Sequence, residues 1–245
     1  MQILHTLYGV YALLVFAVVV FGITCPLVIL GPTLSMRRAA GRFGVRSAMW
    51  LIGSPLRIRG RGHIPAGPCV VVANHASYLD GIVLTAALPP RVSFLVQDGA
   101  ASWPYVGTVI RRMGVSFVAR GRAREASRQM RELIRRARAG ESLAIFPEGT
   151  FEAEPGLLRF RDGAFMIAAH GELPVVPAVI RGTRTVLGDG QWLPRAAAVT
   201  IEFLPPVAPV GRGRAAVVSL REQARSAILG RLDEPDRALN AAATP

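Results

Sequence analysis

An apolar run from Leu7 to Leu30 restricts the possible folds of this chain more than any other feature. As an α-helix rising about 1.5 Å per residue, the run would extend about 36 Å, enough to cross the hydrocarbon core of a bilayer. The first 36 residues contain no charged side chain apart from His5 when it is protonated. We therefore expect an N-terminal membrane helix. Pro26 and Pro32 can kink it, so insertion into one leaflet is the alternative. A cleaved signal peptide is disfavoured because no basic segment precedes the run.

The chain is strongly basic, with 29 arginines, no lysine and 16 acidic residues, which gives a formal net charge of +13. Without lysine, P-loop and Schiff-base chemistry are excluded. No acidic residue precedes Asp80, whereas seven arginines do: Arg37, Arg38, Arg42, Arg46, Arg57, Arg59 and Arg61. This charge predicts an anionic partner such as a membrane surface, nucleic acid or a phosphorylated substrate. Because the arginines follow the apolar run, the positive-inside rule places the rest of the chain at the cytoplasmic face.

Strand-like and helix-like segments alternate after the break at residues 53–55, which predicts an α/β domain over residues 56–232. The expected strands cover residues 56–59, 69–73, 92–96, 116–118, 143–146, 175–180 and 199–203. The expected helices cover residues 78–88, 105–113, 124–139, 163–170 and about 219–232. A capping box formed by Ser219 and Glu222 is predicted to open the last helix.

Two segments flank this domain. Residues 1–55 combine the membrane helix with a short helix from Phe43 to Ile52, which would lie either in the membrane interface or in an ordinary core. Residues 233–245 are expected to form a flexible tail. The two cysteines, Cys25 and Cys69, indicate neither a disulfide framework nor a metal cluster, so no metal site is expected.

Residues 74–80 read Asn-His-Ala-Ser-Tyr-Leu-Asp and follow an apolar strand-like run. A histidine can accept and return a proton near neutral pH, and a carboxylate can orient its ring. Positions five apart on one helix point about 140° apart, so His75 should precede the helix and Asp80 should lie in its first turns. This pattern makes His75 a candidate general base oriented by Asp80. If this pattern stood alone, a purely structural role for His75 and Asp80 would be the alternative.

Two further strand-like segments end in polar groups. The segment at residues 114–120 ends in Arg120. The sequence Phe-Pro-Glu-Gly-Thr at residues 146–150 places Glu148 in a turn with exposed backbone N–H groups. Ligands of open α/β sheets bind outside the carboxyl ends of the strands. We therefore expect a base, a guanidinium group and an anion-accepting turn to meet in one crevice.

These motifs resemble the four ordered blocks of the glycerolipid acyltransferase family, most like the lysophosphatidic acid acyltransferases. The first block, Asn-His-x4-Asp, matches residues 74–80, and the second block, Gly-x-x-Phe-x-x-Arg, matches residues 114–120. Phe-Pro-Glu-Gly-Thr is met at residues 146–150, and the Pro-x-x-Pro strand at residues 173–177. The resemblance covers roughly residues 56–210 and implies an α/β fold with a mixed sheet flanked by helices.

The resemblance implies transfer of an acyl group from coenzyme A or acyl carrier protein to a lysolipid hydroxyl at a membrane. No other cofactor is implied. His75 and Asp80 would be catalytic. The implied substrate-binding residues are Asn74, Phe117, Arg120, Glu148, Gly149 and Thr150.

Two positions depart from the family pattern. The family continues its third block with Arg-Ser, whereas Phe151-Glu152 stands here, and Gln97-Asp98 follows the third strand where many members carry a lysine. Two cations expected near the acceptor are therefore missing, and Arg159 or Arg161 could compensate. Lysophosphatidic acid is the first expected acceptor, and another lysolipid, such as a lyso-ornithine lipid, is the alternative.

Two other classes of function compete with the enzyme. The charge alone would suit a nucleic-acid-binding protein, but the apolar N-terminal run and the absence of a nucleic-acid-binding motif argue against it, so no nucleic acid partner is expected. A non-catalytic membrane adaptor with the same fold is disfavoured because both His75 and Asp80 are present.

Overall fold

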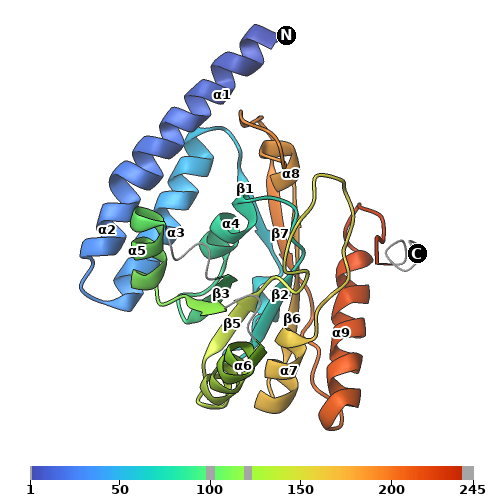
Figure 1. Ribbon diagram of the computed structural model, residues 1–245. Helices are drawn as coiled ribbons and strands as arrows, with labels where there is room; N and C mark the ends of the chain where they lie inside the picture. Colours follow the sequence, from blue (N-terminus) through green and yellow to red (C-terminus); the bar gives the residue numbers. More distant parts are fainter. Residues whose placement is uncertain (1, 98–102, 119–122, 239–245) are drawn as a thin grey trace.

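The computed structural model describes residues 2–97, 103–118 and 123–238, and it gives only the backbone of Gln97, Val118, Ala123, Arg124 and Ala126. Seven strands form one sheet in the order β1-β7-β6-β2-β5-β3-β4 (Figure 1). The strands are β1 (Leu56–Arg59), β2 (Val70–Ala73), β3 (Val92–Gln97), β4 (Ser116–Val118), β5 (Ser142–Ile145), β6 (Val175–Arg181) and β7 (Val199–Phe203). Every strand predicted from the sequence is present to within one residue at either end.

The sheet is mixed, as predicted. The strands β6, β2, β5, β3 and β4 are parallel to one another. Strand β7 runs antiparallel to β6, and β1 pairs with β7 in the parallel direction. In the centre, Val72 of β2 pairs with Ile145 of β5 and with Pro177 of β6. The segments that follow β2 and β5 therefore leave the same edge of the sheet side by side, which is the edge at which α/β proteins bind ligands.

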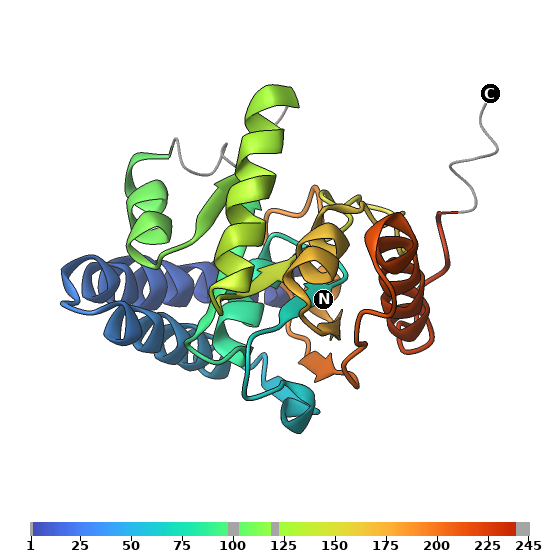
Figure 2. The ribbon, with the colours of Figure 1, turned by 90° about the horizontal axis from the view of Figure 1, so that it is seen from below.

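Helices cover both faces of the sheet (Figures 1 and 2). One face is covered by α3 (Leu34–Leu51) and α4 (Leu79–Ala87). The other is covered by α6 (Ala123–Arg138), α7 (Gly163–Gly171) and α9 (Gly213–Leu229). The remaining helical segments are α1 (Gln2–Phe16), the π-helix η1 (Ala17–Thr24), α2 (Cys25–Leu30), the 3₁₀ turn η2 (Arg61–His63), α5 (Pro104–Arg112) and α8 (Thr183–Val186).

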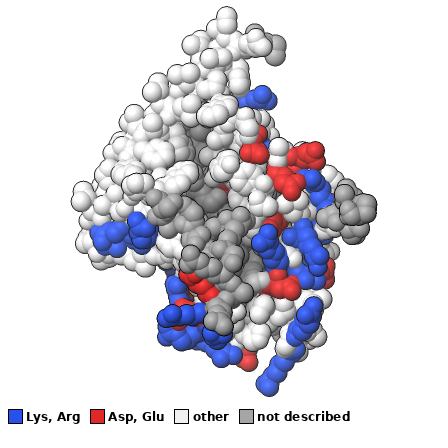
Figure 3. Space-filling model, viewed as in Figure 1, with Lys and Arg blue, Asp and Glu red and all other residues white. Residues whose placement is uncertain are grey.

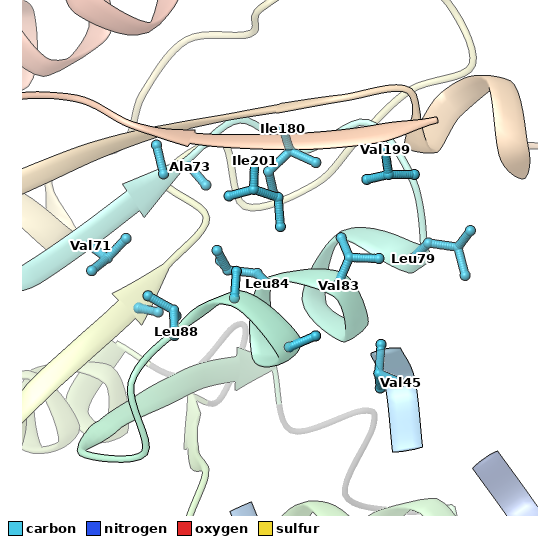
Figure 4. Close-up of a cluster of buried hydrophobic side chains, with 14 of the residues drawn as sticks. Val45, Val71, Ala73, Leu79, Val83, Leu84, Leu88, Ile180, Val199 and Ile201 are labelled. Carbon is cyan, nitrogen blue, oxygen red and sulfur yellow. The ribbon is translucent and has the colours of Figure 1, made fainter. Parts of the chain in front are cut away.

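The central strands are buried on both faces and contribute to two hydrophobic cores. Side chains alternate across a strand, so Val71 and Ala73 of β2 pack toward α4, whereas Val70 and Val72 pack toward α7 and α9. Figure 4 shows the first of these cores, in which α4 and Val45 of α3 meet the sheet. Burial on both faces explains why β2 reads as a continuous apolar run.

The segment from Gln2 to Leu30 forms one helix, and in the described part of the chain it alone is long and apolar enough to cross a membrane. Figure 3 shows no acidic side chain over α1, whereas charged side chains gather around α6 and α9. The second half of this helix does not project from the domain. The hydroxyl of Tyr105 in α5 donates to the carbonyl of Phe21 at 2.6 Å, and the space for a side chain at Gly44 of α3 is filled by Thr24.

The second N-terminal helix, α3, begins at Leu34, nine residues before the predicted start at Phe43. The Thr33 hydroxyl caps it by accepting the N–H of Met36 at 3.3 Å. Part of this helix belongs to the core, whereas a position in the membrane interface stays a prediction. Its inner face, including Val45, is buried in the core, whereas the ring of Phe43 on its outer face is 75% exposed.

The C-terminal helix differs from the prediction in a similar way. It begins at Gly213, and Ser219 lies inside it, where the hydroxyl accepts from the Gln223 side chain instead of capping the helix. Residues 233–238 are held to the domain, because Asp236 pairs with Arg225 at 2.5 Å. The expectation of a flexible tail at residues 233–245 stays a prediction. Residues 239–245 lie outside the described residues.

Candidate active site

His75 and Asp80 come together where β2 ends and α4 begins. His75 lies in the loop before α4, and Asp80 is the second residue of the helix. The ring Nδ1 of His75 is 2.9 Å from Oδ2 of Asp80. The carboxylate can only accept, so Nδ1 carries the proton and Nε2 is left with a free lone pair. The His75 side chain is 19% exposed and Asp80 is fully buried, so only the ring can meet a substrate.

The Asp80 carboxylate is fixed by the backbone of the loop that precedes α4. Oδ2 also accepts the N–H groups of Ala76 at 2.5 Å and of Ser77 at 2.8 Å. The other oxygen, Oδ1, is buried and has no hydrogen-bond partner among the described protein atoms. Three donors on one oxygen leave the carboxylate little freedom to turn, so it can hold the imidazole ring in one orientation.

Glu148 joins the third motif to the first. Its Oε1 accepts the backbone N–H of His75 at 2.7 Å, and its Oε2 accepts the backbone N–H of Leu158 at 2.8 Å. The side chain is 3% exposed. Burial raises the pKa of the Glu148 carboxyl to about 8, although the two backbone N–H groups act in the opposite direction. Because both oxygens are engaged, the geometry gives Glu148 a positioning role, and its predicted contact with substrate stays a prediction.

Asn74 and Ser77 tie the first motif to neighbouring elements. The Asn74 amide donates to the carbonyl of Ile180 at 2.9 Å and accepts the N–H of Ile180 at 2.7 Å, so it extends the pairing of β2 with β6. The Ser77 hydroxyl donates to the carbonyl of Leu187 at 2.5 Å, after α8. The side chain of Asn74 is buried and both of its polar atoms are paired, which fits a positioning role better than the predicted substrate contact.

Aromatic rings surround the imidazole of His75. The Phe146 ring is stacked on it with centroids 4.3 Å apart, and the Phe151 ring is tilted against it at 4.7 Å. The edge of Tyr78 meets Phe151 at 4.6 Å. Sequence reasoning noticed Phe151 only as a departure from the family pattern. The structure shows that this departure places an apolar ring directly beside the candidate base.

The remaining predicted site residues lie at different distances from this centre. Gly149 has a φ of 74°, and a β-carbon there would lie 3.0 Å from Nε of Arg161, so the guanidinium of Arg161 packs on the Phe-Pro-Glu-Gly-Thr turn. Thr150 is exposed on the same turn. Phe117 lies in the middle of β4, paired with Val96 of β3. Arg120 lies outside the described residues.

Comparisons with known proteins identify the family of this chain. The model of the acyltransferase family matches residues 55–181, just over half of the chain. A 1-acyl-sn-glycerol-3-phosphate acyltransferase of Saccharomyces cerevisiae is 24% identical over 75% of this chain and 62% of its own length. The beta form from Homo sapiens is 30% identical over 72% of this chain and 64% of its own length. The chain thus spans a little over 60% of the length of these two relatives.

The fold has a solved counterpart. The crystal structure of the 1-acyl-sn-glycerophosphate (LPA) acyltransferase PlsC from Thermotoga maritima superposes with a TM-score of 0.71 at 24% identity. The match covers 94% of this chain and 97% of that chain, and it confirms the predicted mixed α/β fold. Because the family model covers just over half of the chain, including all four sequence blocks, this chain belongs to the acyltransferase family.

Proposed function

We propose that this protein is a membrane-bound O-acyltransferase that moves an acyl chain from a thioester to the hydroxyl of a lysophospholipid, first of all lysophosphatidic acid. The observation that carries the proposal is the 2.9 Å contact between His75 Nδ1 and Asp80 Oδ2 at the ligand-binding edge of the sheet. Membership of the acyltransferase family and the names of the relatives support the choice of reaction.

The pair supplies what this reaction needs. A lipid hydroxyl is a weak nucleophile at neutral pH, so Nε2 of His75 removes its proton as the oxygen attacks the thioester carbon. Asp80 stabilises the imidazolium that forms. The C–S bond then breaks, and the imidazolium returns the proton to the departing thiolate. The products are an ester and a free thiol, and His75 is neutral again. Acyl-coenzyme A and acyl carrier protein fit this chemistry equally well as donors.

The acceptor head group would meet the turn at residues 146–150. The Arg161 side chain is exposed, packs on Gly149 and has no ion-pair partner among the described residues. A guanidinium group binds phosphate oxygens well, so Arg161 can replace the arginine that the family carries where Phe151 stands here. Phe151 makes the entrance more apolar. This favours a lysolipid with a less charged head group, such as a lyso-ornithine lipid, as the second candidate acceptor.

The helix from Gln2 to Leu30, with α3 packed against it, would hold this site at the membrane. Arg112 of α5 donates to the carbonyl of Ile29 at 2.9 Å, and Arg37 of α3 donates to that of Gly31 at 2.7 Å. If the helix crossed the bilayer, α3 and its arginines would be carried into hydrocarbon, which is costly. The packing therefore favours insertion into one leaflet, with the α/β domain on the cytoplasmic side as the charge distribution predicts.

A panel assay tests the proposed function. The full-length protein in mixed micelles is given lysophosphatidic acid, other lysophospholipids or a lyso-ornithine lipid, each with acyl-coenzyme A and with acyl carrier protein. We expect turnover with at least one acceptor. Arg161→Gln should raise the KM for a phosphate-bearing acceptor, whereas Arg214→Gln, an exposed control on α9, should not. Inactivity with every acceptor and both donors would refute the proposal and leave the non-catalytic adaptor.

A further inference from the structure

Three arginines converge on the C-terminal end of α4, away from the candidate active site. Arg42 and Arg46 come from α3, and Arg61 comes from η2. Each donates to a different carbonyl of the end of α4: Arg46 to Ala86 at 3.0 Å, Arg61 to Ala87 at 3.2 Å and Arg42 to Leu88 at 3.5 Å. We call these three residues the arginine cluster.

Capping of the helix does not account for this much positive charge. The C-terminus of a helix carries about half a negative charge, which one arginine more than balances. No carboxylate among the described residues forms an ion pair with any member of the cluster. Burial and then the positive charges of their neighbours lower the pKa of both Arg42 and Arg61. Each guanidinium has five N–H donors and uses one on a backbone carbonyl, so most of the donors remain available to an anion.

The cluster lines open space large enough for a head group. A cavity of about 480 Å³ is bordered by all three arginines together with Phe43 and Pro90. A second cavity of about 440 Å³ is bordered by Arg46, Arg61 and Trp50. Figure 2 shows α3 and the turn after β1 on the same flank of the molecule. An anion in the first cavity would therefore contact side chains from two separate elements.

The surroundings identify the kind of anion. The rings of Phe43 and Trp50 are 75% and 76% exposed, and both are on α3, the helix that carries Arg42 and Arg46. The same helix packs against the apolar helix that would enter the membrane. An exposed aromatic ring beside arginines is typical of a surface that lies at the boundary between head groups and acyl chains. A soluble phosphate compound would not need the two exposed rings.

We propose that the arginine cluster binds the head group of an anionic phospholipid of the membrane, with Phe43 and Trp50 in contact with the acyl-chain region. Asp80 lies near the start of α4 and the cluster near its end, so the two are about 10 Å apart along the helix axis. The bound lipid is therefore a structural partner and not the acyl acceptor. This proposal does not depend on the proposed acyl transfer, because its test measures binding.

The experiment uses the full-length protein in a non-ionic detergent, titrated with phosphatidylglycerol or phosphatidylcholine and followed by native mass spectrometry and by the melting temperature. Wild-type protein should retain phosphatidylglycerol and melt at a higher temperature with it than with phosphatidylcholine. The variant Arg42→Gln/Arg46→Gln/Arg61→Gln should bind phosphatidylglycerol roughly 100-fold more weakly. The amide nitrogen of glutamine corresponds to Nε of arginine, so Arg46→Gln can keep the bond to Ala86, which helps the variant to fold.

Two controls make the outcome decisive. Arg57→Gln/Arg131→Gln/Arg214→Gln removes the same charge from exposed sites outside the cluster and should keep the lipid preference. If the triple variant fails to fold, Arg46→Gln alone should still weaken binding about tenfold relative to Arg57→Gln. The proposal is refuted if cluster and control variants bind phosphatidylglycerol equally well. It is also refuted if inorganic phosphate at the same concentration displaces the lipid or produces the same shift in melting temperature.

Discussion

Glu148 Oε1 accepts the backbone N–H of His75 at 2.7 Å, across 73 positions of sequence. The bond joins the loop after β2 to the turn after β5, and the second oxygen of Glu148 joins the same turn to Leu158. Because Glu148 binds the backbone of His75, it fixes where the loop lies and leaves the imidazole ring to Asp80. The position and the orientation of the candidate base are therefore set by two different carboxylates.

Replacement of Glu148 by glutamine should destabilise the protein at pH 5, where the contribution of Glu148 to folding is nearly complete. The amide keeps one acceptor, so either His75 or Leu158 loses its partner for a buried N–H, which costs about 1–3 kcal/mol. Thermal or chemical unfolding of the full-length protein in detergent measures the loss. Glu172→Gln serves as the control, because the Glu172 side chain is exposed and makes no hydrogen bond among those described. A variant as stable as this control would show that the two bonds contribute little.

The stability contributed by Glu148 should depend on pH. Burial raises its pKa in the folded protein to about 8, above the value of 4.5 for an unperturbed carboxyl, so the folded state holds the proton more tightly than the unfolded state. This contribution is complete below pH 4.5 and is lost as the pH rises through 8, with a slope of at most about 1.4 kcal/mol per pH unit. The measurement compares unfolding of wild type and Glu148→Gln from pH 5 to about pH 9. A gain of wild-type stability over the variant with rising pH would mean that the N–H donors outweigh burial.

Asp80→Asn should impair catalysis much more than substrate binding. Its amide oxygen can still accept from Ala76 and Ser77, so most of the loop persists, but the negative charge opposite His75 Nδ1 is lost. We expect kcat to fall roughly 10²- to 10⁴-fold with little change in KM. Steady-state kinetics on the accepted lysolipid tests this. A loss confined to KM would assign Asp80 to substrate binding.

Gly149→Ala should cost more stability than Gly190→Ala. Both glycines have a φ just above 70°, so each alanine variant pays a similar backbone penalty of about 1–2 kcal/mol. Nothing lies within 4 Å of a β-carbon at Gly190, whereas one at Gly149 would meet the Arg161 guanidinium at 3.0 Å. Unfolding experiments on both variants isolate the contact. Equal losses of stability in the two variants would show that the Arg161 side chain makes room for the β-carbon at no cost.

The local elements could be read from the sequence because their patterns are local. The continuous apolar run of β2 and the stripe of α6 that contains Leu133 and Ala137 predicted a buried strand and an amphipathic helix, and both are present. The start of α3 was missed because arginines interrupt the apolar pattern, although Thr33 was available as a cap. The start of α9 was misplaced because Ser219 and Glu222 imitate a capping box inside a helix.

The sequence predicted only those contacts of the site that lie within a single motif. The contact of His75 with Asp80 follows from five positions of sequence, and it was expected. The bond from Glu148 to His75 and the bonds from Asn74 to Ile180 depend on how β2, β5 and β6 pair, which no local pattern contains. The contact of Phe151 with the imidazole ring was missed for the same reason.

The most direct test of the account is the acyl-transfer rate of His75→Ala on the lysolipid that the panel assay selects. The variant keeps the backbone N–H that Glu148 accepts, so its melting temperature and membrane attachment should stay close to those of wild type. The control is His170→Ala on α7, which removes an exposed imidazole outside the site. We predict a loss of turnover of at least about 10²-fold for His75→Ala and none for His170→Ala. Turnover by a folded His75→Ala variant within tenfold of wild type would contradict the role of His75 as the general base.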